Sequence, residues 1–388
     1  MALGAKRLDG LSGWTAVTEK QQISKSTAID LTNHYCSPYI YRTCGPAQNA
    51  CPMLRYVMLL LLPLLFVRHE AAAQETMPAY YDNAGRDDVL SGGVKMIPIT
   101  TPSGTYRVWT KRVGNNPRKK VLLLHGGPGA THAYFEAFDS YLPGAGIEYY
   151  YYDQLESGNS DKPGDPSLWN IPRFVDEVEQ VRIALGLDST NFFLLGHSWG
   201  GILALEYAFA HGEQLKGLII SNMMASVPEY NRYAAEVLAP QMPPEVVAEI
   251  KQLEAAEDYR NPRYEELVMN NFYTDHVLRM PLDEWPEPVL RGFGDLNYDI
   301  YLAMQGPSEF GIREGATLEP WDRFDDLKRL RIPTLCIGAE YDTMDPKYMK
   351  KMAEALPHGR YLYLPEGSHM AMYDDQRRYF AGLIDFIR

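Results

Sequence analysis

Short apolar runs alternate with stretches of helical spacing along most of the chain. Runs of five to seven mostly apolar residues, short enough for buried strands, lie at Lys120–Leu124, Ile147–Tyr152, Asn191–Leu195, Leu215–Ile220, Ile332–Gly338 and Arg360–Leu364. Helical spacing predicts helices at His132–Tyr141, Arg173–Leu187, Trp199–His211, Lys347–Leu356 and Arg377–Ile387. Strands that alternate with helices predict a mostly parallel sheet with helices on both faces, which binds ligands at the carboxyl ends of its strands.

Two segments depart from this alternation. Val94–Ile99 and Tyr106–Val113 flank the turn Pro102-Ser103-Gly104, a pattern that predicts a hairpin. Between residues 223 and 329 the alternation stops, and helical patterns, prolines and aromatic residues predict an inserted helical cap. We therefore expect a core in two parts, residues 74–222 and 330–388, with a cap formed by residues 223–329.

Residues 53–73 are typical of a secretory signal peptide. Arg55 precedes the apolar stretch Val57–Val67, which is too short to span a bilayer comfortably, and a small-residue site follows at Ala71-Ala72-Ala73. Because signal peptides begin chains, we expect translation to start at Met53 and residues 1–52 to be an upstream extension. This interpretation implies a periplasmic or secreted protein without a stable membrane anchor and with a mature N-terminus near Gln74.

The chain is acidic, and most of its cysteines precede the predicted core. Its 388 residues carry a formal net charge of −13. Residues 1–73 hold seven Lys/Arg and four Asp/Glu, so the remainder carries 30 basic and 46 acidic residues, net −16. Nucleic-acid binding needs a basic face, which this balance argues against. Cys336 alone lies in the predicted core, and its apolar neighbours predict a buried, unreactive thiol.

The chemistry centres on Ser198. The apolar run Phe192–Leu195 leads into Gly196-His197-Ser198-Trp199-Gly200-Gly201, and helical spacing resumes directly afterwards. This pattern predicts a sharp strand-to-helix turn that exposes the Ser198 hydroxyl as a nucleophile, with glycines at 196 and 200 because a Cβ there would meet the neighbouring chain. The helix start also points free N–H groups at an oxyanion beside Ser198.

A serine nucleophile needs a base, and the base needs an orienting carboxylate. Of the nine histidines, His369 lies just past the strand Arg360–Leu364, at the same sheet edge as Ser198. Asp342 follows the strand Ile332–Gly338 and reaches that edge too. Asp345 is the fallback, although its place before Pro346 favours a helix N-cap. The chain order Ser198, Asp342, His369 is the one expected of α/β-hydrolases.

The oxyanion needs two backbone donors. One is predicted to be the N–H of Trp199, and the other that of Gly127, in the loop His125-Gly126-Gly127-Pro128-Gly129 after a buried strand. The histidines lack paired metal-ligand spacing, and no nucleotide-binding loop occurs in the sequence. We therefore expect neither a metal nor a cofactor.

Several motifs together resemble the proline iminopeptidase family of α/β-hydrolases, especially its branch of tricorn-interacting aminopeptidases and L-amino acid amidases. They are His-Gly-Gly-Pro-Gly at 125–129, Asp153-Gln154 leading to Gly158-Asn159-Ser160-Asp161, Gly-x-Ser-x-Gly-Gly at 196–201, and Gly306-Pro307-Ser308-Glu309-Phe310. The likeness runs from about Ile97 to the C-terminus. It implies an α/β-hydrolase fold and an exopeptidase that releases an N-terminal residue, often proline, from short peptides.

The resemblance also assigns a role to Glu309, which matches the family's glutamate for the substrate's free α-ammonium. A buried carboxylate left without that partner would cost several kcal/mol. The chain departs from the pattern at two positions. Thr343 follows the predicted catalytic aspartate, at a position where some relatives have a second glutamate that helps to bind the amine. Either Asp345 replaces that glutamate or the amine is bound more weakly, which would favour amide or ester substrates. Glu156 stands where relatives usually have glycine, and nothing in the sequence explains it.

The leading hypothesis is a serine aminopeptidase with a preference for proline. An L-amino acid amidase or an esterase would use the same triad, although Glu309 argues against an esterase. A hydrolase-fold binding protein without activity is the third hypothesis, which the complete triad and glycine loop disfavour. In the leading hypothesis the partners are short peptides or amino acid amides with a free N-terminus.

Overall fold

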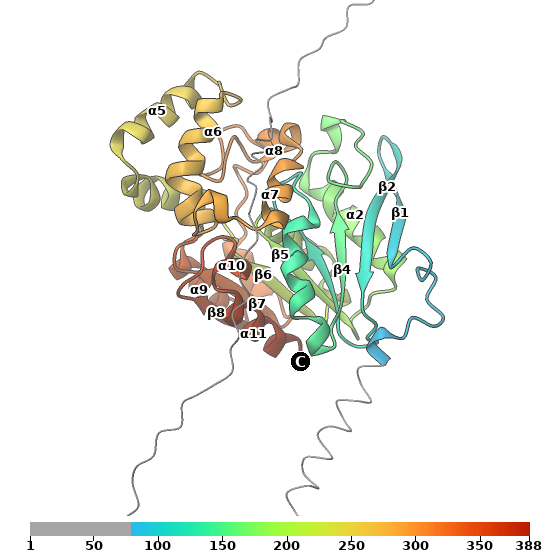
Figure 1. The fold of residues 1–388 in the computed structure, drawn as a ribbon. Helices are drawn as coiled ribbons and strands as arrows, with labels where there is room; N and C mark the ends of the chain where they lie inside the picture. Colours follow the sequence, from blue (N-terminus) through green and yellow to red (C-terminus); the bar gives the residue numbers. More distant parts are fainter. Residues whose placement is uncertain (1–78) are drawn as a thin grey trace, which may run out of the picture. The chain divides into compact units, whose positions relative to one another are not determined.

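An eight-stranded sheet forms the centre of the computed structural model, which describes residues 79–388 (Figure 1). The strands are β1 (Val94–Thr101), β2 (Gly104–Val113), β3 (Lys120–Leu124), β4 (Glu148–Asp153), β5 (Phe192–His197), β6 (Gly217–Ser221), β7 (Thr334–Ala339) and β8 (Gly359–Leu364). Their order in the sheet is β1-β2-β4-β3-β5-β6-β7-β8. The pairs β1–β2 and β2–β4 are antiparallel and the others are parallel, which confirms the predicted hairpin and mostly parallel sheet.

Both faces of the sheet are buried under helices. In β3, Leu122 and Leu124 belong to one hydrophobic core and Val121 and Leu123 to the other, because successive side chains of a strand point to opposite faces. The first core is completed by α2 (Ile171–Leu185), α3 (Trp199–His211) and α9 (Pro346–Ala355), and the second by η1 (His132–Ser140) and α11 (Gln376–Ile387). Two buried faces explain why the strands are continuous apolar runs.

Element boundaries differ from the predicted ones by a few residues. Strand β7 begins at Thr334 rather than Ile332, since Pro333 has no N–H to donate to a sheet. The helix predicted at His132–Tyr141 is a 3₁₀ helix, η1, in which the buried Phe135 and Phe138 are three residues apart, the repeat of that helix.

In the segment between β6 and β7 the regular elements are all helices, while residues 305–323 contain none. Figure 1 shows helices of this segment, coloured yellow to orange, at one end of the sheet. Its α-helices are α4 (Val227–Tyr233), α5 (Pro244–Ala255), α6 (Pro262–Val268), α7 (Glu287–Gly294) and α8 (Tyr298–Met304). Two π-helices, η5 (Ala234–Leu238) and η7 (Met269–Val277), and three 3₁₀ helices, η6 (Ala239–Gln241), η8 (Leu282–Glu284) and η9 (Phe324–Arg329), complete it. The short elements elsewhere are η2 (Pro143–Ala145), η3 (Pro166–Leu168), η4 (Gly212–Gln214) and α10 (Ala371–Asp374).

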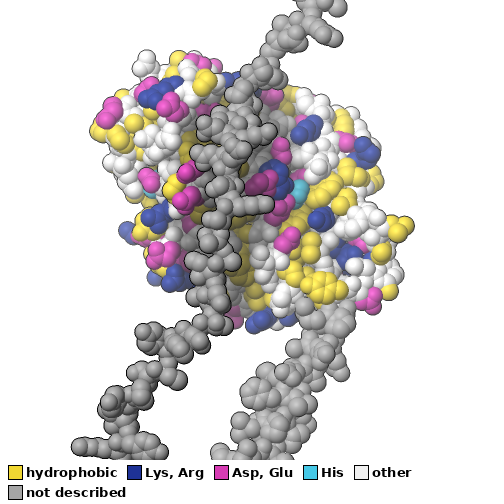
Figure 2. Space-filling model, in the orientation of Figure 1, with side chains coloured by type: hydrophobic (Ala, Val, Ile, Leu, Met, Phe, Trp, Pro, Cys, Tyr) yellow, Lys and Arg dark blue, Asp and Glu magenta, His cyan; other side chains and the backbone are white. Residues whose placement is uncertain are grey.

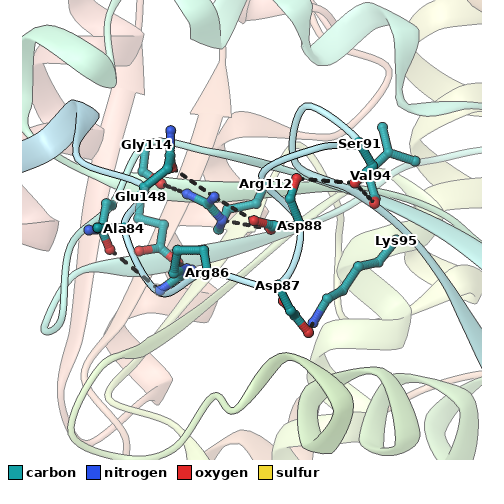
Figure 3. A network of polar contacts seen from close by, with 12 residues as sticks. Ala84, Arg86, Asp87, Asp88, Ser91, Val94, Lys95, Arg112, Gly114 and Glu148 are labelled. Carbon is teal, nitrogen blue, oxygen red and sulfur yellow. Dashed lines mark hydrogen bonds and ion pairs between the residues drawn. The ribbon is translucent and has the colours of Figure 1, made fainter.

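The segment before β1 is fastened to the sheet by ion pairs (Figure 3). Arg112 of β2 donates two hydrogen bonds to Asp88, of 2.8 and 2.7 Å, and both side chains are about 95 % buried. The Arg112 hydrogen bonds lower the pKa of Asp88. Arg86 pairs with Glu148 of β4 at 2.9 Å. A buried pair that loses one partner leaves an uncompensated charge, so this segment is an integral part of the folded unit.

Several predictions concern residues outside the described part of the chain. The upstream extension at 1–52 and the signal peptide at 53–73 both lie there and stay predictions. Within residues 79–388, Cys336 is fully buried and burial raises its pKa to about 12, as expected for an unreactive thiol. In that same range, no helix is long and apolar enough to cross a membrane.

Charges of both signs are mixed on the surface. On the face drawn in Figure 2, Lys and Arg side chains are scattered among Asp and Glu. Exposed basic and acidic side chains of the described residues also form ion pairs, such as Arg263 with Glu249 at 2.9 Å and Arg360 with Asp385 at 2.7 Å. The visible part of this face therefore carries no concentrated basic region of the kind that nucleic acids bind.

Candidate active site

Ser198 forms the sharp turn between β5 and α3. Its φ of 56° and ψ of −130° lie in a region that residues with a Cβ rarely adopt. A Cβ at Gly196 would overlap the carbonyl of Gly200, and one at Gly200 would overlap the carbonyl of Leu124. As predicted, Gly196 and Gly200 are required for steric reasons, because β5, α3 and the end of β3 approach one another closely at this turn.

The structure places Asp342 and His369 together at the carboxyl end of the sheet. Asp342 follows β7, His369 follows β8, and His369 Nδ1 lies 2.8 Å from Asp342 Oδ1. Both side chains are buried. Burial alone would lower the pKa of His369, but the charge of Asp342 and its hydrogen bond raise it above the ordinary value. The fallback, Asp345, instead accepts a hydrogen bond from Lys347 N at 2.9 Å as the N-cap of α9.

His197 connects Ser198 with His369. It immediately precedes Ser198, its ring centroid lies 4.8 Å from that of His369, and its Nε2 lies 2.8 Å from the His369 carbonyl oxygen. On the other side, His197 Nδ1 lies 3.1 Å from the Tyr134 hydroxyl, which accepts a hydrogen bond from Gly126 N at 2.6 Å. These contacts fix the proton of His197 on Nε2. Burial lowers its pKa to about 3, so the ring is neutral.

Two residues that sequence reasoning missed hold the Asp342–His369 pair. Asn222 follows β6 and donates to the second oxygen of Asp342 at 2.7 Å and to the Ser368 carbonyl at 3.2 Å. The hydroxyl of Thr343 lies 3.3 Å from Asp342 Oδ1 and 3.2 Å from His369 Nδ1. The position of Asn222 directly after a buried strand was the available signal. For Thr343 the available signal was that the sequence has threonine where the family resemblance leads us to expect glutamate.

The glycine loop after β3 lies against Ser198. A Cβ on Gly126 would come within 2.9 Å of the Ser198 Cβ. Gly127 has a φ of +104°, which favours glycine. Trp199 is the first residue of α3, so its N–H has no acceptor within the helix. The predicted oxyanion donors, Gly127 and Trp199, therefore belong to the two backbone segments that flank the nucleophile.

Gln154 fastens these two segments to each other. It follows β4, and its side chain accepts from Trp199 Nε1 at 2.9 Å and donates to the His125 carbonyl at 3.0 Å. The His125 ring is fully buried, which lowers its pKa to about 4, and its Nε2 accepts a hydrogen bond from Gln154 N at 3.1 Å. A neutral histidine and an amide thus fix the loop without placing a charge beside it.

Glu309 is a buried carboxylate within a group of tyrosines. Tyr301 donates to its Oε1 at 2.7 Å and Gln305 to its Oε2 at 3.1 Å, while its backbone N–H donates to Tyr273 at 3.0 Å. The residue is 8 % exposed, and among residues 79–388 it has no salt-bridge partner. Its charge contributes to the raised pKa of His369, so the two groups lie within electrostatic range of each other. The arrangement offers a negative charge that lacks a counter-ion.

Glu156 has a backbone conformation that favours glycine, the residue that the family resemblance leads us to expect there. Its φ is +75°, yet the residue is buried and its carboxylate is satisfied, accepting from Gly164 N at 2.8 Å and Trp169 Nε1 at 3.3 Å. The side chain thus compensates for a conformation that glycine would adopt without strain. As for metals, the described part of the chain contains no group of three or more histidine, cysteine or carboxylate side chains that could hold one.

Known proteins share this fold and much of this sequence. Residues 119–376 match the alpha/beta hydrolase fold family. A proline iminopeptidase of Chitinophaga pinensis is 56% identical over 293 residues, 76% of this chain and 97% of that protein. The crystal structure of a Mycobacterium smegmatis proline iminopeptidase has a TM-score of 0.64 at 30% identity, and that of VinJ 0.68 at 32%, each covering 75% of this chain and 97% of the other. The chain therefore belongs to the proline iminopeptidase family of α/β-hydrolases.

Proposed function

We propose that the protein is a serine aminopeptidase that releases the N-terminal residue, preferably proline, from short peptides. The observation that carries this proposal is the buried Glu309 carboxylate, held by Tyr301 and Gln305 and without a cationic partner among the described residues, whose charge acts on His369. A substrate with a free α-ammonium would supply the missing positive charge next to its first peptide bond. The names of the relatives, which include proline iminopeptidases at 56% identity, support the same substrate class.

In the proposed mechanism Ser198 Oγ attacks the first carbonyl carbon while His369 Nε2 takes its proton. Asp342 stabilises the imidazolium through the 2.8 Å contact with Nδ1. The N–H groups of Gly127 and Trp199 donate to the oxyanion. The C–N bond then breaks as His369 returns the proton to the leaving amine. Water, deprotonated by His369, hydrolyses the resulting ester of Ser198 and frees the amino acid.

Hydrolysis of a small panel of substrates tests the proposal. The full chain is expected to cleave proline and alanine 2-naphthylamide, and to cleave N-acetyl-proline 2-naphthylamide at least about 100-fold more slowly, because an acetylated nitrogen has no charge to pair with Glu309. Equal cleavage of the acetylated substrate would rule out amine recognition. Turnover confined to prolinamide, or to a short acyl ester, would instead identify an amidase or an esterase.

The pH dependence of the reaction should report the raised pKa of His369. His369 must be neutral to accept a proton, so kcat/KM should fall as the pH drops through a pKa above the ordinary 6.5. Cyclopentanecarboxylic acid methyl ester has no ionisable group, so a profile of its kcat/KM from about pH 5 to about pH 9 shows this acid limb without titration of the substrate. Asp342→Asn should move the limb to lower pH. A wild-type limb at or below 6.5 would contradict the assignment.

A further inference from the structure

Helix α8 begins where the glycine loop and the loop after β4 meet. Its N-cap residue is Asn297, whose backbone N–H donates to the Gly129 carbonyl at 2.9 Å. The contact is close, since a Cβ on Gly129 would lie 2.7 Å from the Asn297 carbonyl oxygen and 2.6 Å from Ile300 Cγ2. The first turn of α8 is therefore seated on the loop that carries Gly127.

The side chain of Asn297 does not cap its own helix. It donates instead to the backbone carbonyl of Glu156 at 3.0 Å, and it lies 3.5 Å from the Glu156 carboxylate. Asparagine usually occupies an N-cap because its side chain satisfies a free helical N–H. Here the Asn297 side chain instead contacts Glu156, which is 141 positions away in the sequence. Glu156 has a strained backbone conformation, and its carboxylate is held by Gly164 and Trp169.

The other end of α8 holds Glu309. Tyr301 lies within the helix and Gln305 is its C-cap, and these two side chains donate the hydrogen bonds to the two carboxylate oxygens. One short helix thus spans from the glycine loop, where the oxyanion would form, to the carboxylate that would bind the amine. Its position fixes the distance between these two groups.

We propose that Asn297 is a positioning residue that sets the separation between the oxyanion site and Glu309, and thereby restricts hydrolysis to the bond after a single N-terminal residue. The inference rests on the proposed role of Glu309. Both the amine and the carbonyl of a one-residue acyl group must be held at once, and a misplacement of about 1 Å can cost about 100-fold in rate. The backbone carbonyl of Glu156, held in place by the contacts of its carboxylate with Gly164 and Trp169, serves as the fixed point for Asn297.

A double-mutant cycle between Asn297 and Glu309 tests this coupling. The measured quantity is the selectivity, defined as kcat/KM for proline methyl ester divided by kcat/KM for cyclopentanecarboxylic acid methyl ester, which lacks only the amine. Asn297→Ala is expected to lower the selectivity at least about fivefold in the wild-type background and less than about twofold when Glu309→Gln is present. Asn297→Asp, equal in size but unable to donate to the Glu156 carbonyl, should behave like Asn297→Ala.

Asn261→Ala is the matched control. Asn261 is also a helix N-cap, of α6, but its side chain accepts from Arg263 N at the surface, so its loss should lower the melting temperature without changing the selectivity. If Asn297→Ala and Asn297→Asp lower the selectivity equally in both backgrounds, or not at all, the inference is wrong. If Glu309→Gln itself leaves the selectivity unchanged, the proposed amine recognition fails first and the inference fails with it.

Discussion

Replacing Ser198 with alanine is expected to lower kcat for proline 2-naphthylamide by a factor of about 10⁴ to 10⁶. The substitution removes the atom that attacks the carbonyl, and alanine offers no nucleophile in its place. The N–H groups of Gly127 and Trp199 stay in position, so a small residual rate above that in water should persist. KM should change little, because Glu309 and its tyrosines are untouched.

The measurement combines steady-state kinetics with labelling by a fluorophosphonate, which forms a covalent bond with an activated serine. Wild-type protein should be labelled and Ser198→Ala should not. Ser103→Ala, in the exposed turn between β1 and β2, serves as the control and should keep full activity and labelling. A Ser198→Ala variant that retains a few per cent of activity would remove Ser198 as nucleophile. An unlabelled wild type would favour the hypothesis of a binding protein without activity.

The second large effect is expected from Glu309→Gln. It should lower kcat/KM for proline methyl ester by a factor of about 10² to 10³, since truncating one partner of a buried charged pair costs about 3 to 4 kcal/mol. Glutamine has nearly the same shape and can still accept from Tyr301, so the tyrosine group should stay packed. Only the charge is lost. The cyclopentane ester, which lacks an ammonium group, should lose far less.

The exposed Glu340 provides the control for charge alone. It accepts a hydrogen bond from Tyr363 at 2.7 Å near the carboxyl end of the sheet, and Glu340→Gln removes the same charge from solvent-screened surface. Its effect on either ester should stay within about twofold. Equal losses on the two esters in Glu309→Gln would show that Glu309 supports the structure of the site rather than binding the amine.

The sequence predicted best what depends on short-range periodicity. Strands buried on both faces give continuous apolar runs, and parallel strands bring their carboxyl ends to one edge, so Ser198, Asp342 and His369 could be placed together from strand ends alone. No comparable pattern in the sequence indicated that η1 is a 3₁₀ helix or that η5 and η7 are π-helices. Tertiary packing, rather than the spacing of apolar residues, selects these helix types.

Contacts between distant segments could not be derived in this way. Asn222 and Asp342 are 120 residues apart, and although each follows a predicted strand, nothing in the sequence indicates that they contact each other. The unusual Glu156 was visible but unexplained, since neither its φ of +75° nor its contact with Asn297 leaves a trace in its sequence neighbours. Chain order predicted the triad, whereas the residues that hold the Asp342–His369 pair and the cap in place required coordinates.

The series of hydrogen bonds through His197 links the position of the glycine loop to that of His369. Gly126 N–H donates to Tyr134, the Tyr134 hydroxyl to His197 Nδ1, and His197 Nε2–H to the carbonyl of His369, so each donor in this series has its own acceptor. We therefore expect a displacement of the glycine loop to move the backbone of His369 with it. We expect thermal fluctuations of the glycine loop and of the His369 backbone to be correlated, so that their relative geometry is preserved while both move.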